Sequence, residues 1–164
     1  MTQQSEENPP VIPLWQRGKE GDFTPSRVTR ADVIAEARTW DGTPHRHQGR
    51  LKHIATDCVG FAIMVPVTLG LLPPDFDING YSRHPDPELM KKYLKQFADR
   101  TDRLIGGNLL LLMPKRIPQH LGILTSETSM IHAIDKVRGV REHILDQRWR
   151  SSIAGIYSYR GILE

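Results

Sequence analysis

The sequence of 164 residues contains one cysteine, Cys58, and this scarcity excludes two kinds of site. An intramolecular disulfide needs a second cysteine, and so does a zinc site built on cysteine ligands. Cys58 is therefore either a small buried side chain, as free cysteines often are, or a reactive thiol. Its sequence neighbours have to decide between the two.

The sequence also lacks long apolar runs and blocks of one charge. No apolar stretch is long enough to cross a bilayer, and the first 30 residues lack the charged and then apolar layout of a secretion signal. We therefore expect no membrane insertion, and synthesis in the cytoplasm without a signal peptide. The net charge of +3 and the isoelectric point near 9.2 give a weak bias toward an anionic partner, but the basic residues are scattered.

The composition predicts one folded domain preceded by an arm. Hydrophobic residues make up 38% of the chain and charged residues 25%, which is ordinary for a globular protein of this length. Residues 1–29 are polar and rich in proline, a pattern typical of an extended arm that packs on its own domain or on a partner. Residues 30–164 are predicted to form the domain.

Within the domain, hydrophobic spacing predicts helices first and strands second. Thr29 or Asp32 can cap a helix that ends before Gly42, and a buried helix begins near Asp57 and kinks or ends around Pro66. A further helix is predicted at 87–98, a loop at 43–56, and strands at 109–113, 120–125, 130–134, 139–144 and 153–157. This segregation is typical of an α+β fold, with helices packed on an antiparallel sheet.

Cys58 and two histidines form a pattern that predicts chemistry. Cys58 follows a loop and opens the most apolar helix, so its sulfur is expected at a helix N-terminus, where the thiolate is favoured. His120 and His132 lie on neighbouring predicted strands and can share one face. A cysteine, a base and a third polar group are the parts of a covalent catalyst, although a lone strand histidine is more often only a hydrogen-bonded, half-buried residue.

Several segments carry a resemblance to a known family. They are 35–50 (AEARTWDGTPHRHQGR), 57–60 (DCVG), 120–123 (HLGI), 131–133 (IHA) and the closing 149–159, and they span most of residues 30–160. In their order and spacing they resemble the NlpC-type (NlpC/p-sixty) cell-wall peptidases, in particular the version found with phage tails and gene-transfer particles. The resemblance implies a papain-like α+β fold and hydrolysis of an amide bond in peptidoglycan peptide stems, commonly the one after D-glutamate. It implies no metal and no cofactor.

The same resemblance assigns roles to residues. Cys58 is expected to be the nucleophile, His120 its base and His132 the group that orients the base. His45 stands where the family usually has a tyrosine that assists the oxyanion, and it is expected to contact the substrate. For Asp57 two roles are open: gripping the free amine of a stem peptide, or capping the helix.

One further residue departs from the expected pattern, and three groups of residues suggest other sites or surfaces. Val59 follows the cysteine where the family generally has serine or alanine, so we expect the substrate subsite to differ. His45, His47 and His53 suggest a metal site, but no carboxylate or second cysteine accompanies them, and a solvated loop explains His47 and His53 better. Arg46, Arg50 and Lys52 lack interleaved aromatic residues, so we expect contact with an acidic wall polymer and no binding of nucleic acid. The arginines between 138 and 150 are predicted to form a solvated face.

Three functions stay open at this stage. The first is a peptidoglycan peptidase that acts as part of a virion tail, whose proline-rich arm docks on tail proteins. The second is a structural tail-tip or hub component with reduced or no activity. The third is an amidase or acyltransferase of the same clan with a substrate outside the cell wall.

Overall fold

A computed structural model describes residues 27–83, 86–113, 116, 119–134 and 138–163. The predicted arm therefore lies outside the described residues, apart from its last three positions. The elements are α1 (Arg30–Arg38), β1 (Arg50–Leu51), β2 (Ala55–Thr56), α2 (Cys58–Leu69), α3 (Pro87–Phe97), β3 (Ala98–Thr101), β4 (Leu109–Leu112), β5 (His120–Ser126), β6 (Ser129–Ala133), β7 (Val140–Ile144), α4 (Gln147–Arg150) and β8 (Ile153–Tyr159).

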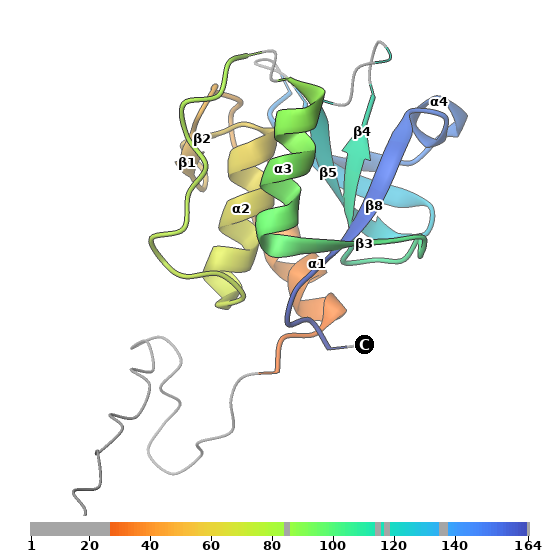
Figure 1. Ribbon diagram of the computed structural model, residues 1–164, viewed down its shortest axis with the longest axis horizontal. Coiled ribbons are helices and arrows are strands. Elements are labelled where there is room, and N and C mark those ends of the chain that lie inside the picture. Colours follow the sequence, from red (N-terminus) through yellow and green to blue (C-terminus); the bar gives the residue numbers. More distant parts are fainter. Residues whose placement is uncertain (1–26, 84–85, 114–115, 117–118, 135–137, 164) are drawn as a thin grey trace, which may run out of the picture.

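The fold is centred on a six-stranded antiparallel sheet in the order β3-β8-β4-β5-β6-β7. Helices α1, α2 and α3 pack on one face of this sheet, and the short helix α4 lies on the other (Figure 1). Strands β1 and β2 form a separate hairpin next to the start of α2. The predicted α+β architecture, with helices packed on an antiparallel sheet, is confirmed.

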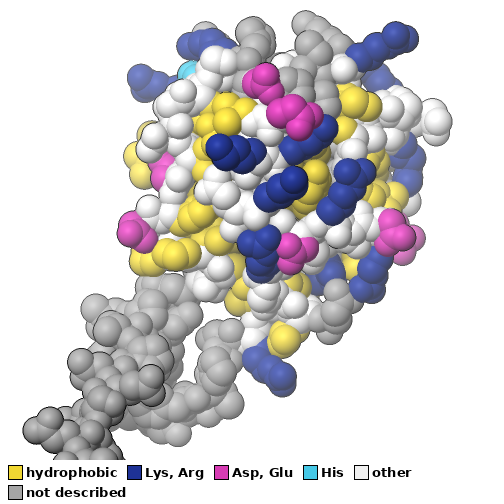
Figure 2. All heavy atoms as spheres, viewed as in Figure 1, with side chains coloured by type: hydrophobic (Ala, Val, Ile, Leu, Met, Phe, Trp, Pro, Cys, Tyr) yellow, Lys and Arg dark blue, Asp and Glu magenta, His cyan; other side chains and the backbone are white. Residues whose placement is uncertain are grey.

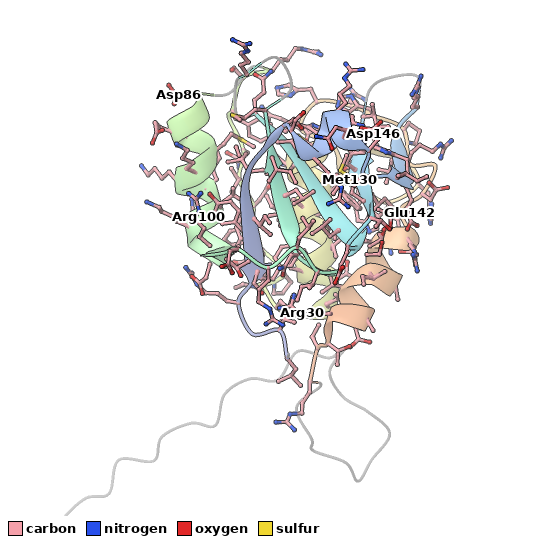
Figure 3. All side chains as sticks on the ribbon, turned by 90° about the vertical axis from the view of Figure 1, so that its right-hand side faces the viewer. Arg30, Asp86, Arg100, Met130, Glu142 and Asp146 are labelled. Carbon is pink, nitrogen blue, oxygen red and sulfur yellow. The ribbon has the colours of Figure 1, made fainter. Side chains whose placement is uncertain are left out.

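Strand β4 shows how the sheet separates two cores. Leu109 and Leu111 face the helices and join the main hydrophobic core, whereas Leu110 and Leu112 point to the opposite side. There they meet Met130 of β6, which Figure 3 labels, and Trp149 of α4. All four leucines are fully buried, which explains why β4 is a continuous apolar run rather than an alternating one.

The first helix is built as its sequence predicts. Thr29 caps α1 and exchanges hydrogen bonds with Asp32 in a capping box, so two otherwise unpaired backbone N–H groups are satisfied. At the other end, Arg38 forms a bidentate pair with Glu142 of β7 at 2.9 Å. Figure 3 shows Glu142 on the side of the sheet that approaches α1, so this pair ties the helix to the edge strand.

Helix α2 continues past Pro66, so an end at this proline, one of the two predicted alternatives, is wrong. The helix runs to Leu69 and stops at Gly70, whose φ of 76° provides a left-handed cap. Pro66 has no N–H to give to the carbonyl of Ala62, one helical turn earlier. The buried hydroxyl of Tyr159 donates to that carbonyl at 2.9 Å instead, and the helix persists.

The sequence did not predict β3 or α4, and it gave the β1-β2 hairpin as loop. Strand β3 is the polar segment Ala98–Thr101, which follows α3 directly and is held by pairing with β8. Helix α4 has only four residues, too few for a periodic pattern. The predicted helices at the start of the domain, at Cys58 and at 87–98, and the five predicted strands, are all present.

Charge is dispersed over the surface seen in Figure 2. Lys and Arg side chains lie among neutral and hydrophobic ones, with acidic side chains between them. This agrees with a weak and scattered positive excess. In the part of the chain that the structure describes, no helix is long and apolar enough to span a membrane.

Candidate active site

Cys58 is the first residue of α2, as the sequence predicts. Asp57 caps this helix and accepts a hydrogen bond from the backbone N–H of Gly60 at 2.8 Å. Gly60 is needed for the close approach between the helix start and the preceding loop, because a Cβ there would lie 2.1 Å from the carbonyl oxygen of Gly49. The thiol of Cys58 is half-buried, at the edge of the main core.

The backbone N–H groups at the start of α2 favour the thiolate of Cys58, as predicted, but two other effects outweigh them. Burial and the negative charge of Asp57 raise the pKa of Cys58 to about 12. Hydrogen bonds from the backbone at Leu121 and at the start of α2 oppose this effect but are outweighed. The thiol is therefore neutral at neutral pH. The contact with Leu121 also locates the sulfur beside the start of β5, where His120 lies.

Asp57 is a buried hub, and its role as a helix cap is confirmed. Only 4% of the residue is exposed, and its carboxylate also accepts from the backbone N–H of Gln48 at 2.6 Å and from the Tyr81 hydroxyl at 2.8 and 2.9 Å. A substrate amine would have to displace one of these donors to reach the carboxylate. The role of Asp57 as an amine grip stays a prediction.

Two loop residues expected at the surface are instead packed around this hub. Arg50 bonds to Asp77 at 2.7 Å and to the Ile78 carbonyl oxygen at 2.6 Å, so it is not a free cation for an acidic polymer. His47 lies 3.5 Å from the Asp57 carboxylate and packs edge-on against the Tyr81 ring. His53, in contrast, is exposed as predicted. Spacing gives no sign of these contacts, because they depend on the fold of the 71–83 segment.

His120 and His132 are brought together. The Nε2 atom of His120, at the first position of β5, lies 2.6 Å from the Nδ1 atom of His132 on β6. His132 is fully buried and His120 is partly buried. Burial lowers the pKa of His120 to about 4, with the charge of His45 as the next cause. Burial, followed by the charges of His120 and of His143 on β7, lowers the pKa of His132 further. Both imidazoles are therefore neutral at neutral pH.

A third histidine, which the sequence did not predict as part of the site, extends this series of hydrogen bonds. The Nε2 atom of His143 on β7 lies 2.7 Å from the Nε2 atom of His132. Trp149 of α4 packs against all three imidazole rings. The ring of His132 is the closest, with its centroid 5.0 Å from that of Trp149. The sequence did contain a sign of His143: the predicted strand at 139–144 includes a histidine and follows the strand of His132. The segment around Trp149 is thus not only a solvated face.

His45 and Val59, the two departures from the expected pattern, lie on different sides of Cys58. The backbone of His45 pairs with Thr56, and its charge acts on the pKa of His120, so His45 lies near the base. Val59 is 3% exposed and lines a small void with Met90 and Leu94 of α3. Its side chain faces the core, so it is not part of an open substrate subsite in this structure.

The three imidazoles are arranged as a relay and not as a metal site. Both ring nitrogens of His132 face nitrogens of neighbouring histidines, so they cannot also point at a shared ion. No group of three histidine, cysteine or acidic side chains suited to a metal was found among the described residues. Beside the relay, an open groove of about 370 Å³ is lined by Ile134, Arg138, Arg141, Glu142, His143 and Trp149.

Comparison with solved structures identifies the fold. The NlpC/p60 domain of the peptidoglycan hydrolase SagA matches with a TM-score of 0.57 and 21% identity, over 80% of this chain and 99% of that one. An NlpC/p60 family protein from Bacillus cereus has a TM-score of 0.57 and 19% identity over 78% of this chain, and NlpC1 from Trichomonas vaginalis has 0.59 and 11% over 87%.

These two matches cover only 39% and 48% of the longer chains, so the present chain corresponds to one part of each. No protein-family model and no curated protein sequence matches the chain. The chain has the papain-like fold of NlpC/p60 domains. At these identities the likeness concerns the fold, and the chemistry has to be argued from the site.

Proposed function

We propose that this protein is a cysteine peptidase that hydrolyses an amide bond in the peptide stems of peptidoglycan. The observation that supports it best is the arrangement of Cys58 at the start of α2, beside β5, with His120 bonded to His132 at 2.6 Å. The protein carries this arrangement on a fold shared with a peptidoglycan hydrolase domain. The sequence resemblance supplies the substrate class.

The mechanism we propose follows from the neutral state of both Cys58 and His120. His120 takes the proton from the Cys58 thiol as the sulfur attacks the substrate carbonyl, rather than forming an ion pair beforehand. The backbone N–H of Cys58 donates to the oxyanion of the tetrahedral intermediate. His120 then protonates the leaving amine, which leaves a thioester on Cys58. A water molecule, deprotonated by His120, attacks this thioester and releases the acid product.

Two further residues have proposed roles at this site. His132 accepts a hydrogen bond from His120 and orients it, as the short distance between them favours. His45, close enough for its charge to act on His120, contacts the substrate near the oxyanion. Asp57 keeps its second proposed role, the grip on a stem-peptide amine, which requires a donor such as Tyr81 to give way.

The proposal also includes the particle in which the peptidase acts. The resemblance to tail-associated members suggests that the peptidase acts as part of a phage tail or similar particle, to which residues 1–29 dock. Particles purified from a lysate are the sample that tests this. We expect the full chain to copurify with them and a chain without residues 1–26, which keeps the core contact of Val28 and the Thr29 cap, to be absent.

A structural tail component is the second candidate, and the raised pKa of Cys58 favours it, because a thiol that rarely ionises is a weak nucleophile. Digestion of purified peptidoglycan fragments, followed by mass spectrometry, separates the candidates. We expect the wild type to release a defined peptide, Cys58→Ala to release none, and the exposed-histidine control His53→Gln to match the wild type. If the wild type cuts no bond, the peptidase proposal fails. Transfer of an acyl group to an added amine would instead indicate an acyltransferase.

A further inference from the structure

The hydrogen bonds that link His120, His132 and His143 lead to a backbone carbonyl oxygen. This carbonyl fixes the direction of each hydrogen bond between the three rings. The Nδ1 atom of His143 lies 2.8 Å from the carbonyl oxygen of Ile144. A carbonyl oxygen only accepts, so the proton of neutral His143 is on Nδ1 and its Nε2 atom is an acceptor.

The constraint passes from ring to ring. Because the Nε2 atom of His143 accepts, the Nε2 atom of His132 at 2.7 Å must donate, and neutral His132 then has an accepting Nδ1 atom. The Nε2 atom of His120, 2.6 Å from that nitrogen, must donate in turn. His120 is left with a lone pair on Nδ1, the nitrogen that does not face His132.

We propose that His143, anchored by the Ile144 carbonyl, is a positioning residue that holds His120 in the one tautomer able to take the proton of Cys58. This inference rests on the proposed function for its catalytic meaning, but the tautomers themselves exist whether or not the protein cleaves peptidoglycan. His143 touches neither the thiol nor the substrate. It acts through His132.

Side-chain nitrogen NMR of the full chain tests the tautomers directly. We expect His120 and His132 to carry their protons on Nε2 and His143 on Nδ1 at neutral pH. A His120 that carries its proton on Nδ1 in the wild type would overturn the proposal. Because this measurement needs no substrate, a failure of the proposed function leaves it decisive, and the wild type alone suffices if a variant does not fold.

Three variants then connect tautomer and rate. His143→Gln keeps a donor for the Ile144 carbonyl and an acceptor for His132, so its kcat should stay within about threefold of the wild type. His143→Leu frees both tautomers, and we expect a fall in kcat of about threefold to tenfold at unchanged KM. His143→Lys offers only donors, should put the His120 proton on Nδ1, and should lower kcat by about a hundredfold or more, as a wrong tautomer does in serine proteases.

The control is His53→Gln, which removes an exposed histidine and should change neither spectra nor rate. Equal kcat values and an unchanged His120 signal in the Leu and Lys variants would show that His143 is only a packing partner of Trp149.

Discussion

Cys58, His120 and His132 share one property at the scale of the single residue: their surroundings favour the uncharged form. The pKa of the thiol is raised and the pKa values of the two imidazoles are lowered, in each case with burial as the largest cause. A site of this kind has no stored ion pair. In the proposed mechanism, its reactivity depends on proton transfer from Cys58 to His120 during the attack and therefore on the tautomer of His120.

These buried histidines predict a stability that falls in acid. The unfolded chain binds protons on them below pH 6.5, whereas folded His120 stays neutral down to about pH 4. In that window the unfolded state binds more protons, so the free energy of unfolding drops as the pH is lowered, by about 1.4 kcal/mol per pH unit for each histidine. Asp32 and Glu142, whose pKa values are lowered, add to the loss at the acid end.

Urea denaturation at several pH values measures this slope. We expect His132→Asn to reduce it by about 1.4 kcal/mol per pH unit and His53→Gln to leave it unchanged. A free energy of unfolding that stays constant between pH 6.5 and pH 4 would contradict the buried, neutral state of both imidazoles.

The roles expected for residues differed in how far the sequence could predict them. Cys58 at a helix start, and His120 with His132 on adjacent strands, follow from local pattern and strand order. His143 depends on the register between β6 and β7, which a single sequence does not fix. The neutral thiol depends on the depth of burial and on the distance to Asp57, quantities that only the folded chain defines.

At the scale of the element, α2 tolerates a proline within the helix. A residue of the distant strand β8 supplies the hydrogen-bond donor that the proline lacks. Tyr159→Phe should leave the carbonyl of Ala62 buried without a donor and cost about 1 to 3 kcal/mol of unfolding free energy. Pro66→Ala restores the helical N–H to that carbonyl, so in its presence the cost of Tyr159→Phe should fall below about 1 kcal/mol. A double-mutant cycle by urea denaturation measures the difference, and equal costs in both backgrounds would rule out the repair.

Elements with a strong period or a cap were predictable, and elements held by partners were not. Helix α1 has a capping box and α3 has an acidic cap and an apolar face, so both were found. Strand β3 is polar and exists because β8 pairs with it. For α2 the continuation of the helix beyond Pro66 could not be predicted locally, since the compensating hydroxyl of Tyr159 lies 93 positions further along the chain.

At the scale of the whole molecule, contacts near residue 28 mark where the domain begins. Val28 joins the main core, its carbonyl accepts from the N–H of Leu163 at 2.9 Å, and Thr29 caps α1. A chain lacking residues 1–26 keeps all of these contacts and is the matched control. A chain lacking residues 1–29 should lose about 2 to 4 kcal/mol, because the cap and the burial of Val28 are removed. Calorimetry of both truncations checks this, and equal losses would show that the arm contributes to the fold.

The position of β8 in the sheet determines how late during synthesis the candidate site can form. The last strand of the chain is not at an edge: it lies between β3 and β4, so the sheet stays open until residues 153–159 have been synthesised. The Trp149 that packs on the imidazoles comes only just before them. During translation Cys58 therefore leaves the ribosome long before the sheet that aligns its base can close. We expect a variant without residues 153–159 to keep the Cys58 thiol but to lose the packed sheet that brings His120 and His132 together.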